Sequence, residues 1–454
     1  MKMLSVNPFT EEITHEFDMF GVEQVDEAVQ RAEEALLRWK ARSVPDRVEI
    51  FKRVAADLRQ HKRKYGEIIT REMGKPIKQA VSEVEKCAWV CDYYVEHAAR
   101  FLQPESIKTD AAKSTVYFEP LGIILGIMPW NFPFWQVFRF AVPAMAAGNV
   151  CLLKHASNVP LAALEIEKIF TSAGMPTGVF QTLLIDAGSA TRLIEEGKVA
   201  GVSLTGSLVA GSRVGEAAGR NIKKLVLELG GSDPFIVLDD ADLSKAAEVG
   251  MAARALNTGQ SCIAAKRFIV MDSVVEEFQV KFLEYLRMLH VGNPMDEDTD
   301  IGPLAKSEFV EDLNVQLQDA IDKGATIFYG SKPPEGKGFF FQPAVLVNVK
   351  ADMKVAQEEV FGPLAPIVVV KDEEEAVAWA NATKFGLGAS IWSRDVERAV
   401  RLAQRIQSGF VAINDMVKSD PRLPFGGIKK SGMGRELSHY GLKEFVNIKT
   451  VVVN

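Results

Sequence analysis

Short apolar runs alternate with helix-like segments between residues 122 and 229, and this alternation constrains the fold more than any other feature. The apolar runs are GIILGIM, NVCLLK, FQTLL, GVSLT and KLVLEL. Most of them are separated by helix-like segments such as FWQVFRFAVPAMAAG, LAALEIEKIFTSAG and VAGSRVGEAAG. Strands joined by helical crossovers pair in parallel, with helices on both faces of the sheet. We therefore predict an α/β fold with a doubly wound parallel sheet, the usual setting of a nucleotide cofactor.

The rest of the chain predicts further domains around this sheet. Residues 23–101 have the apolar spacing of helices, interrupted by the Gly and Pro of MGKP at 73–76. A second α/β run extends from DPFIVL at 233 to GFVAIND, which ends at 415. Because a chain of 454 residues is too long for one ordinary core, we expect two or three domains.

The C-terminal segment EFVNIKTVVVN is strongly β-prone. A chain that ends on such a strand leaves an unpaired sheet edge unless something covers it. A partner subunit, alone or together with the strand predicted at 114–120, is the expected cover.

Composition and charge exclude several classes of protein. The net charge of −7 is spread along the chain, which favours solubility and argues against a nucleic-acid partner. No run reaches the length of a membrane span, and the N-terminus lacks the apolar core of a signal peptide. We expect a cytoplasmic protein without a membrane partner. Four cysteines in so long a chain form no disulfide framework, and Cys87 and Cys91 lack further ligands for a metal.

Cys262, in the stretch NTGQSC, is the cysteine whose surroundings are hardest to explain by packing. Its small neighbours predict room for a substrate. A free thiol needs a nearby cation, helix end or base to become a nucleophile. The six histidines include no evident partner, whereas Glu228 ends a predicted strand just before Gly230 and Gly231. On local evidence alone, an inert buried cysteine remains the commoner interpretation.

The segment PWNFPFWQVFR at 129–139 offers groups for an oxyanion and for a carboxylate. Asn131 lies between two prolines, and a rigidly held amide there can donate to a developing negative charge. Trp135 and Arg139 are four residues apart and share a helix face. Arg139 has two interpretations, a structural salt bridge or the capture of a substrate carboxylate.

The stretch LTGSLVAG at 204–211 is a candidate phosphate site. Gly206 and Gly211 bracket the first turn of a predicted helix, and Ser207 stands at its start, where amides and dipole favour an anion. Serine at that position is also ordinary capping. Lys154 closes the strand NVCLLK at a βα junction, where a lysine can meet ribose or phosphate oxygens, although a solvated loop lysine is commoner.

Six motifs in order resemble the aldehyde dehydrogenase superfamily over nearly the whole chain: PWNFP, LTGS, LELGGSDP, GQSC, EEVFGP and PFGGIKKSGMGRE. The resemblance implies a Rossmann-type cofactor domain, an α/β catalytic domain and a small β oligomerisation unit, assembled into a homodimer or homotetramer. The domain ranges it implies are 1–106 and 125–229 for the cofactor, 230–430 for catalysis, and 107–124 and 431–454 for oligomerisation.

The resemblance implies three catalytic residues. Cys262 would attack the aldehyde to form a thiohemiacetal, and the Asn131 amide and the Cys262 backbone N–H would hold its oxyanion. Loss of hydride would leave a thioester. Glu228 would act as general base for the water that hydrolyses this thioester. What activates the thiol stays open among backbone dipoles, the cofactor's positive ring and Glu228.

The resemblance also implies a cofactor site. Glu359 would bind the nicotinamide ribose, Phe361 would pack beside the ring, Ser207 would contact the pyrophosphate and Lys154 the adenosine ribose. The remaining implied contacts are Trp130, Gly206, Gly211 and Leu229. NAD-preferring members often have a glutamate where this chain has Ser157, and a serine can hydrogen-bond a 2′-phosphate that a carboxylate would repel. We predict that NADP is preferred and that NAD is possible.

Arg139 and the loop NDMVKSDPRLPFGG resemble the succinate-semialdehyde dehydrogenases within the superfamily. In that comparison Arg139 and Ser419 hold the substrate carboxylate and Trp135 lines the tunnel. The resemblance thus implies oxidation of succinate semialdehyde. Glutarate semialdehyde or an uncharged aliphatic aldehyde is an alternative substrate. A cysteine hydrolase or acyl transferase, and a non-catalytic binding protein, are the alternatives from other classes.

Overall fold

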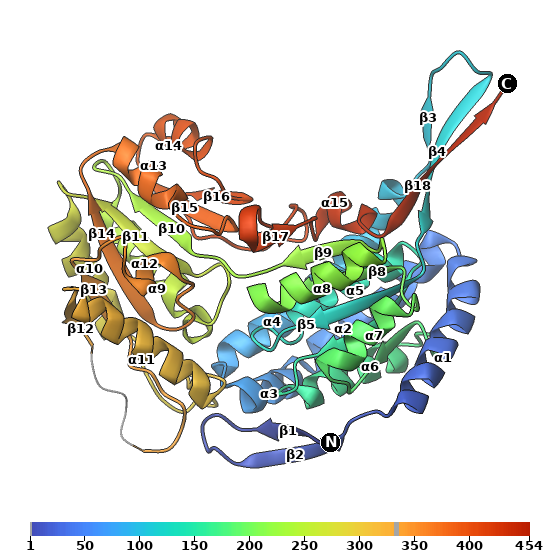
Figure 1. Cartoon of the computed structure of the whole chain (residues 1–454), viewed down its shortest axis with the longest axis horizontal. Coiled ribbons are helices and arrows are strands. Elements are labelled where there is room, and N and C mark those ends of the chain that lie inside the picture. Colours follow the sequence, from blue (N-terminus) through green and yellow to red (C-terminus); the bar gives the residue numbers. More distant parts are fainter. Residues whose placement is uncertain (1, 331–335) are drawn as a thin grey trace.

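Two helix-flanked sheets form the body of the molecule, and a narrow antiparallel sheet projects from it near the C-terminus (Figure 1). The computed structural model describes residues 2–330 and 336–454. The predicted α/β fold class is confirmed. No helix in the described residues has the length and apolar character needed to cross a lipid bilayer.

The first sheet has the strand order β17-β9-β8-β5-β6-β7, and all its pairs except β17-β9 are parallel. Its strands are β5 (Ile123–Met128), β6 (Val150–His155), β7 (Phe180–Thr182), β8 (Gly201–Thr205), β9 (Lys224–Glu228) and β17 (Gly432–Met433). Its connecting helices are α5 (Trp135–Ala146), α6 (Pro160–Ser172), α7 (Ala187–Glu195) and α8 (Leu208–Arg220). The strand order reverses between β5 and β8, the switch point at which such sheets bind nucleotides.

Helices precede this sheet, as predicted for residues 23–101. They are α1 (Val22–Lys40), α2 (Val44–Gln60), α3 (Lys62–Met73) and α4 (Ile77–Phe101). Gly74, at φ 77°, ends α3 in the left-handed conformation that glycine adopts readily, and Pro76 immediately precedes α4. The sequence analysis did not anticipate α7 or the N-terminal hairpin of β1 (Lys2–Val6) and β2 (Ile13–Asp18), which packs against α3 and α6.

The second sheet has the order β12-β13-β14-β11-β10-β15-β16, and only β12 is antiparallel to its neighbour. Its strands are β10 (Asp233–Val237), β11 (Ala265–Met271), β12 (Thr326–Tyr329), β13 (Ala344–Val347), β14 (Leu364–Val370), β15 (Gly388–Trp392) and β16 (Phe410–Ile413). The helices of this half are α9 (Leu243–Ala255), α10 (Val275–Arg287), α11 (Ser307–Asp322), α12 (Lys354–Gln357), α13 (Glu373–Asn381) and α14 (Val396–Ala403). The central strands are almost wholly buried, as expected where helices cover both faces.

The projecting sheet contains the C-terminal strand β18 (Val446–Val453), which pairs antiparallel with all of β4 (Lys113–Pro120). The predicted association of these two strands is confirmed. β3 (Glu105–Ile107) occupies the other side of β4, so β18 is an edge strand. β17 falls in the segment predicted for the oligomerisation unit, yet it pairs with β9 of the first sheet, because the chain returns to the body before α15 (Ser438–Lys443).

Candidate active site

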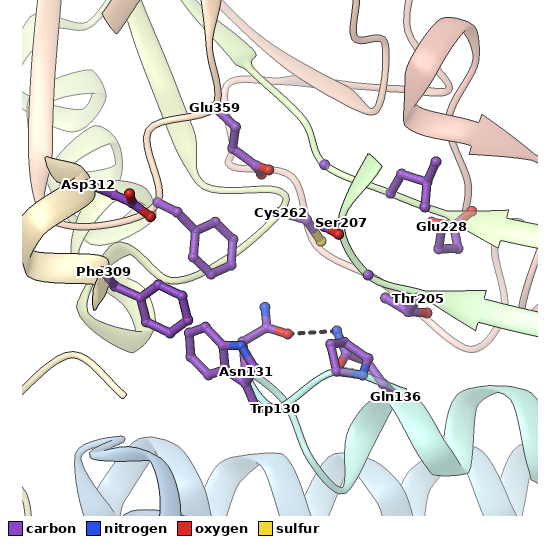
Figure 2. Close-up of a pocket in the computed structure, with 15 residues that line it drawn as sticks. Trp130, Asn131, Gln136, Thr205, Ser207, Glu228, Cys262, Phe309, Asp312 and Glu359 are labelled. Atoms are coloured by element: carbon purple, nitrogen blue, oxygen red, sulfur yellow. Dashed lines mark hydrogen bonds between the residues drawn. The ribbon is translucent and has the colours of Figure 1, made fainter. Parts of the chain in front are cut away.

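A cavity of about 240 Å³ lies where the carboxyl ends of β5, β8 and β9 meet the loop of Cys262 (Figure 2). β5 leads into Asn131 and β9 ends at Glu228, so two elements of the first sheet present their polar groups at the same edge. The predicted site residues that line this cavity are Trp130, Asn131, Gly206, Ser207, Glu228, Leu229, Cys262, Glu359 and Phe361. The structure therefore brings together residues from 130 to 361 around one thiol.

Buried polar side chains shape the loop that carries Cys262. Asn257 and Thr258 have left-handed backbones, with φ of 54° and 56°, which cost energy for residues other than glycine. Their side chains compensate, because Asn257 Nδ2 donates to the Asn131 carbonyl (2.7 Å) and Thr258 Oγ1 to a backbone carbonyl (3.2 Å). Of NTGQSC, only Ser261 and Cys262 line the cavities at this site. The other residues hold the loop, and that their small size makes room for ligands stays a prediction.

The thiol of Cys262 is protonated at neutral pH in this environment. Burial raises its pKa to about 12, although the Lys266 and Arg139 cations act in the opposite direction. Lys266 Nζ donates to the Cys262 carbonyl and to Glu359 Oε1, each at 2.6 Å. Within the described part of the chain, no histidine lines the cavity of Figure 2 or the second cavity at the same thiol, which is described below. A Cys–His pair therefore has no structural support.

The amide of Asn131 is held at both ends. Its Nδ2 donates to the Gln260 carbonyl at 3.0 Å, and its Oδ1 accepts from Gln136 Nε2 at 3.1 Å, the bond dashed in Figure 2. All these groups are buried. Since Nδ2 has two protons and uses one, the second is free for an oxygen bound near Cys262. This fixed donor is what an oxyanion requires.

Glu228 is a buried carboxyl group whose oxygens accept no well-formed hydrogen bond from the described residues. Burial raises its pKa well above the ordinary value, the Arg139 guanidinium opposes this, and the Glu436 carboxylate adds to it. Burial thus favours the protonated form of Glu228 over the carboxylate. A carboxyl group with a raised pKa can take up a proton from water near neutral pH, as a general base must.

The surroundings of this cavity fit a nicotinamide dinucleotide. Ser207 caps α8 by accepting from the Ala210 amide (3.3 Å), so the free amides and the dipole of the helix lie at the cavity. A Cβ placed on Gly206 would meet only the Leu204 side chain, at 3.7 Å, which leaves its backbone open to a ligand. The Trp130 ring, stacked on Phe309 with centroids 4.8 Å apart, provides a flat apolar surface for a ring.

Three predicted cofactor residues do not line this cavity. Gly211 lies inside α8, where a Cβ would come within 2.5 Å of the Leu229 side chain, so its visible role is close packing. Lys154 is the next-to-last residue of β6 and partly buried, and Ser157 follows on an exposed turn. Because β6 is the neighbour of β5, both lie farther along the same sheet edge, where the adenosine end of an extended dinucleotide belongs.

A second cavity, of about 200 Å³, shares Cys262 and Gln136 with the first. The three residues predicted to contact substrate, namely Trp135, Arg139 and Ser419, all line it. Phe132, Phe425 and Lys86 are among its other lining residues. One thiol is therefore reached from two cavities, one fitted for a dinucleotide and one for a small ligand.

Arg139 combines the two interpretations given for it. It lines the second cavity, and its Nε also forms a buried ion pair with Glu436. A further nitrogen, Nη2, donates to Thr205 Oγ1 at 3.2 Å, and the guanidinium lies over the Phe425 ring. A structural salt bridge is therefore present, and the Arg139 cation has Glu436 as its partner.

Sequence reasoning missed four polar residues of this site: Lys86, Gln136, Lys266 and Glu436. Gln136 lies within the segment at 129–139 discussed above, close to Asn131 in sequence, and this closeness was an available signal. Glu436 is inside a recognised motif but pairs with a residue almost 300 positions earlier, which no local pattern indicates. Lys86 borders the apolar face of α4, where a lysine ordinarily reaches solvent.

Known proteins resemble this chain along its whole length. The family model described as "Aldehyde dehydrogenase family" matches residues 1–451. A succinate-semialdehyde dehydrogenase [NADP(+)] of Deinococcus radiodurans is 44% identical over 447 residues, covering 98% of this chain and 94% of the relative. The succinate semialdehyde dehydrogenase [NAD(P)+] Sad of Escherichia coli is 43% identical over 448 residues, covering 99% and 97%. The structure of succinic semialdehyde dehydrogenase from Streptococcus pyogenes with NADP+ superimposes with a TM-score of 0.97 at 36% identity, covering 99% of both chains.

Proposed function

The chain belongs to the aldehyde dehydrogenase family, and we propose that it oxidises succinate semialdehyde to succinate with NADP⁺ as its preferred oxidant. The observation that carries the substrate is the second cavity, because it joins Cys262 to the cationic and hydroxyl groups of Arg139 and Ser419. An aldehyde at the thiol and a carboxylate at those groups can occupy such a cavity together. The relatives named above are succinate-semialdehyde dehydrogenases, which supports the same substrate.

The proposed reaction assigns one task to each polar group. The Cys262 thiol gives its proton to water as Sγ adds to the aldehyde carbon, and the free Nδ2 proton of Asn131 with the Cys262 amide stabilises the oxyanion. A bound nicotinamide dinucleotide supplies the hydride acceptor. Loss of hydride from the thiohemiacetal carbon leaves a thioester on Cys262. Glu228 then takes a proton from water as the water attacks this thioester, which releases the acid and restores the thiol.

The preference for NADP⁺ rests on Lys154 and Ser157. A hydroxyl and an ammonium at the carboxyl end of β6 can bind a 2′-phosphate, which a glutamate at position 157 would repel. Two of the relatives described above are named for NADP(+) or NAD(P)+, and the Streptococcus structure contains NADP+. NAD⁺ remains a possible second oxidant.

The proposed assembly is a homodimer or homotetramer formed through the projecting sheet. β18 is an edge strand with exposed apolar side chains, including Ile448 (62%) and Val452 (54%), which a second copy would cover. The proposed location is the cytoplasm, and four unpaired thiols suit its reducing conditions. Sedimentation of the purified chain tests the assembly; a monomer at micromolar concentration would contradict it.

The test of the proposed function follows reduced-cofactor absorbance with succinate semialdehyde, glutarate semialdehyde and butanal, each with NADP⁺ and NAD⁺. We expect the highest kcat/KM with succinate semialdehyde and NADP⁺, and no turnover by Cys262→Ala. A higher kcat/KM with butanal would refute the carboxylated substrate, and a higher value with NAD⁺ would refute the cofactor preference. Ester or thioester turnover without any dinucleotide, in the absence of aldehyde oxidation, would favour the hydrolase alternative.

A further inference from the structure

Lys86 is a partly buried lysine that lines the second cavity and that the roles above do not use. Its Nζ donates to Ser419 Oγ (2.7 Å) and lies 4.5 Å from the centre of the Trp135 ring. Its position on α4 is well defined, because Glu83, one turn earlier, accepts from the Phe134 and Trp135 amides at 2.9 and 3.0 Å. The ammonium is thus held against two side chains of the substrate cavity.

The hydroxyl of Ser419 is arranged so that it must donate toward the cavity. Lys86 Nζ and Trp135 Nε1 (3.1 Å) both donate to its oxygen, which takes up its two acceptor positions. The hydroxyl proton donates to none of the described residues, although Ser419 is buried, with an exposed fraction of 6%. Two of the three N–H groups of the Lys86 ammonium also remain available to a ligand. This end of the cavity therefore presents donors, and an incoming group there must be an acceptor.

The Glu83 and Asp420 carboxylates act on Lys86 from a distance and not through a direct ion pair among the described residues. Arg139 has Glu436 as its ion-pair partner, and the nearby Glu83 is paired with Lys75. Lys86 forms no ion pair with a carboxylate in residues 2–330 or 336–454. A partly buried cation without a counter-ion is costly unless a ligand supplies the negative charge.

We propose that Lys86 is a further cation that binds the substrate carboxylate, with the Ser419 hydroxyl donating to the same group. The inference rests on the proposed function and refines it, because it adds Lys86 to Arg139 as a cation at this end of the cavity. Arg139 also shapes the cavity and holds Glu436 beside Glu228. The ligand class is a short aldehyde whose far end carries a carboxylate.

The experiment compares Lys86→Met, which keeps the length of the side chain without its charge, with Lys86→Arg, which keeps the charge. Lys78→Met removes a half-exposed lysine of the same helix, which pairs with Asp300 away from the cavity, and is the matched control. Each variant of the full-length enzyme is assayed with succinate semialdehyde and with butanal at saturating NADP⁺. For Lys86→Met we expect kcat/KM to fall about 10- to 100-fold with succinate semialdehyde, mainly through KM, and less than about twofold with butanal. Lys86→Arg should recover part of the loss.

The outcomes separate the inference from the proposed function. If the wild type oxidises succinate semialdehyde no better than butanal, the proposed function fails and the inference fails with it. If the wild type prefers succinate semialdehyde and Lys86→Met keeps that preference, the inference alone is overturned. An equal loss with both substrates would also overturn it, because it would make Lys86 a structural residue.

A second measurement uses the wild type and therefore does not depend on a variant that folds. The pKa of Lys86 is lowered to about 8, mainly by burial and then by Arg139, against the opposing effects of Cys87, Glu83 and Asp420. The cation is present below this pKa and lost above it. The ratio of kcat/KM for succinate semialdehyde to that for butanal should therefore fall as pH rises through 8. The ratio cancels ionisations of Cys262 and Glu228, which both substrates need, and a ratio that is constant from pH 7 to about pH 9.5 would overturn the proposal.

Discussion

Gln136 is predicted to control catalysis through Asn131, and the substitution Gln136→Met tests this. The Gln136 amide donates to Asn131 Oδ1 (3.1 Å), which fixes which end of the Asn131 side chain faces the thiol. Methionine fills a similar volume but cannot donate. The Asn131 oxygen would then be a buried acceptor without a partner, and the amide could rotate to satisfy it at the expense of the oxyanion donor.

The size of the effect follows from the free-energy cost of leaving the Asn131 oxygen without a hydrogen-bond donor. Leaving a buried acceptor unsatisfied costs about 1–3 kcal/mol. If this cost is added to the free energy of the amide orientation that stabilises the oxyanion, kcat/KM falls by about 5- to 150-fold. Removing the donor itself by Asn131→Ala should cost about 100- to 1,000-fold. The loss in Gln136→Met should appear in kcat/KM for charged and uncharged aldehydes alike, because the oxyanion is common to both.

A double-mutant cycle decides whether Gln136 acts through Asn131. The rates of wild type, both single variants and Gln136→Met/Asn131→Ala are measured with butanal, so that carboxylate binding does not contribute. If the reasoning is right, Gln136→Met changes kcat/KM by less than about twofold once Asn131 is alanine, since there is no amide left to orient. A full loss on the alanine background would refute it and would give Gln136 a direct contact with substrate or cofactor.

Three further predictions concern the other groups of the site. In stopped-flow absorbance, Glu228→Gln should give a burst of one reduced cofactor per active site, followed by slow turnover. The reason is that the carboxyl group is assigned to thioester hydrolysis, after hydride transfer. A variant without a burst would place Glu228 in the first step. Because burial raises the pKa of Glu228, its basic form grows as pH rises, so wild-type kcat should increase with pH and that increase should be absent in Glu228→Gln; identical pH profiles would contradict the assignment. Ser157→Glu should lower kcat/KM with NADP⁺ by about 10-fold or more and leave NAD⁺ within about threefold, measured as initial rates; equal losses would remove Ser157 from cofactor choice.

The parts of the site that sequence predicted are those fixed by strand geometry. Asn131, Ser207 and Glu228 follow or end three strands of one parallel sheet, so a correct strand assignment already places them at the same edge. The β-prone C-terminus predicted an edge in need of cover, and the strand at 114–120, one of the expected covers, is its partner in the structure. The strand assignments needed only runs of apolar residues and their flanking turns.

The parts that sequence could not predict depend on side-chain contacts between distant elements. Lys86 borders the apolar face of a helix, and helical periodicity does not say whether its ammonium reaches solvent or a cavity. The pairing of Arg139 with Glu436 needs the tertiary fold, because either residue alone has several plausible partners. The loop role of Asn257 was hidden because a positive φ at a non-glycine residue has no reliable sequence signal.

The distribution of charge around Cys262 explains how the enzyme can distinguish the two ends of one short substrate. Lys266 is bound to Glu359 and to the Cys262 carbonyl, and Arg139 is bound to Glu436, so neither offers a bare charge to an anion. Lys86 offers an unpaired charge, at the end of the cavity where the Ser419 hydroxyl must also donate. A carboxylate that settled at the thiol instead would face the buried Glu228 carboxyl group and a sulfur, and would lose its hydration without an ion pair in return. The energetic difference between these two orientations places the aldehyde, and not the carboxylate, at Cys262.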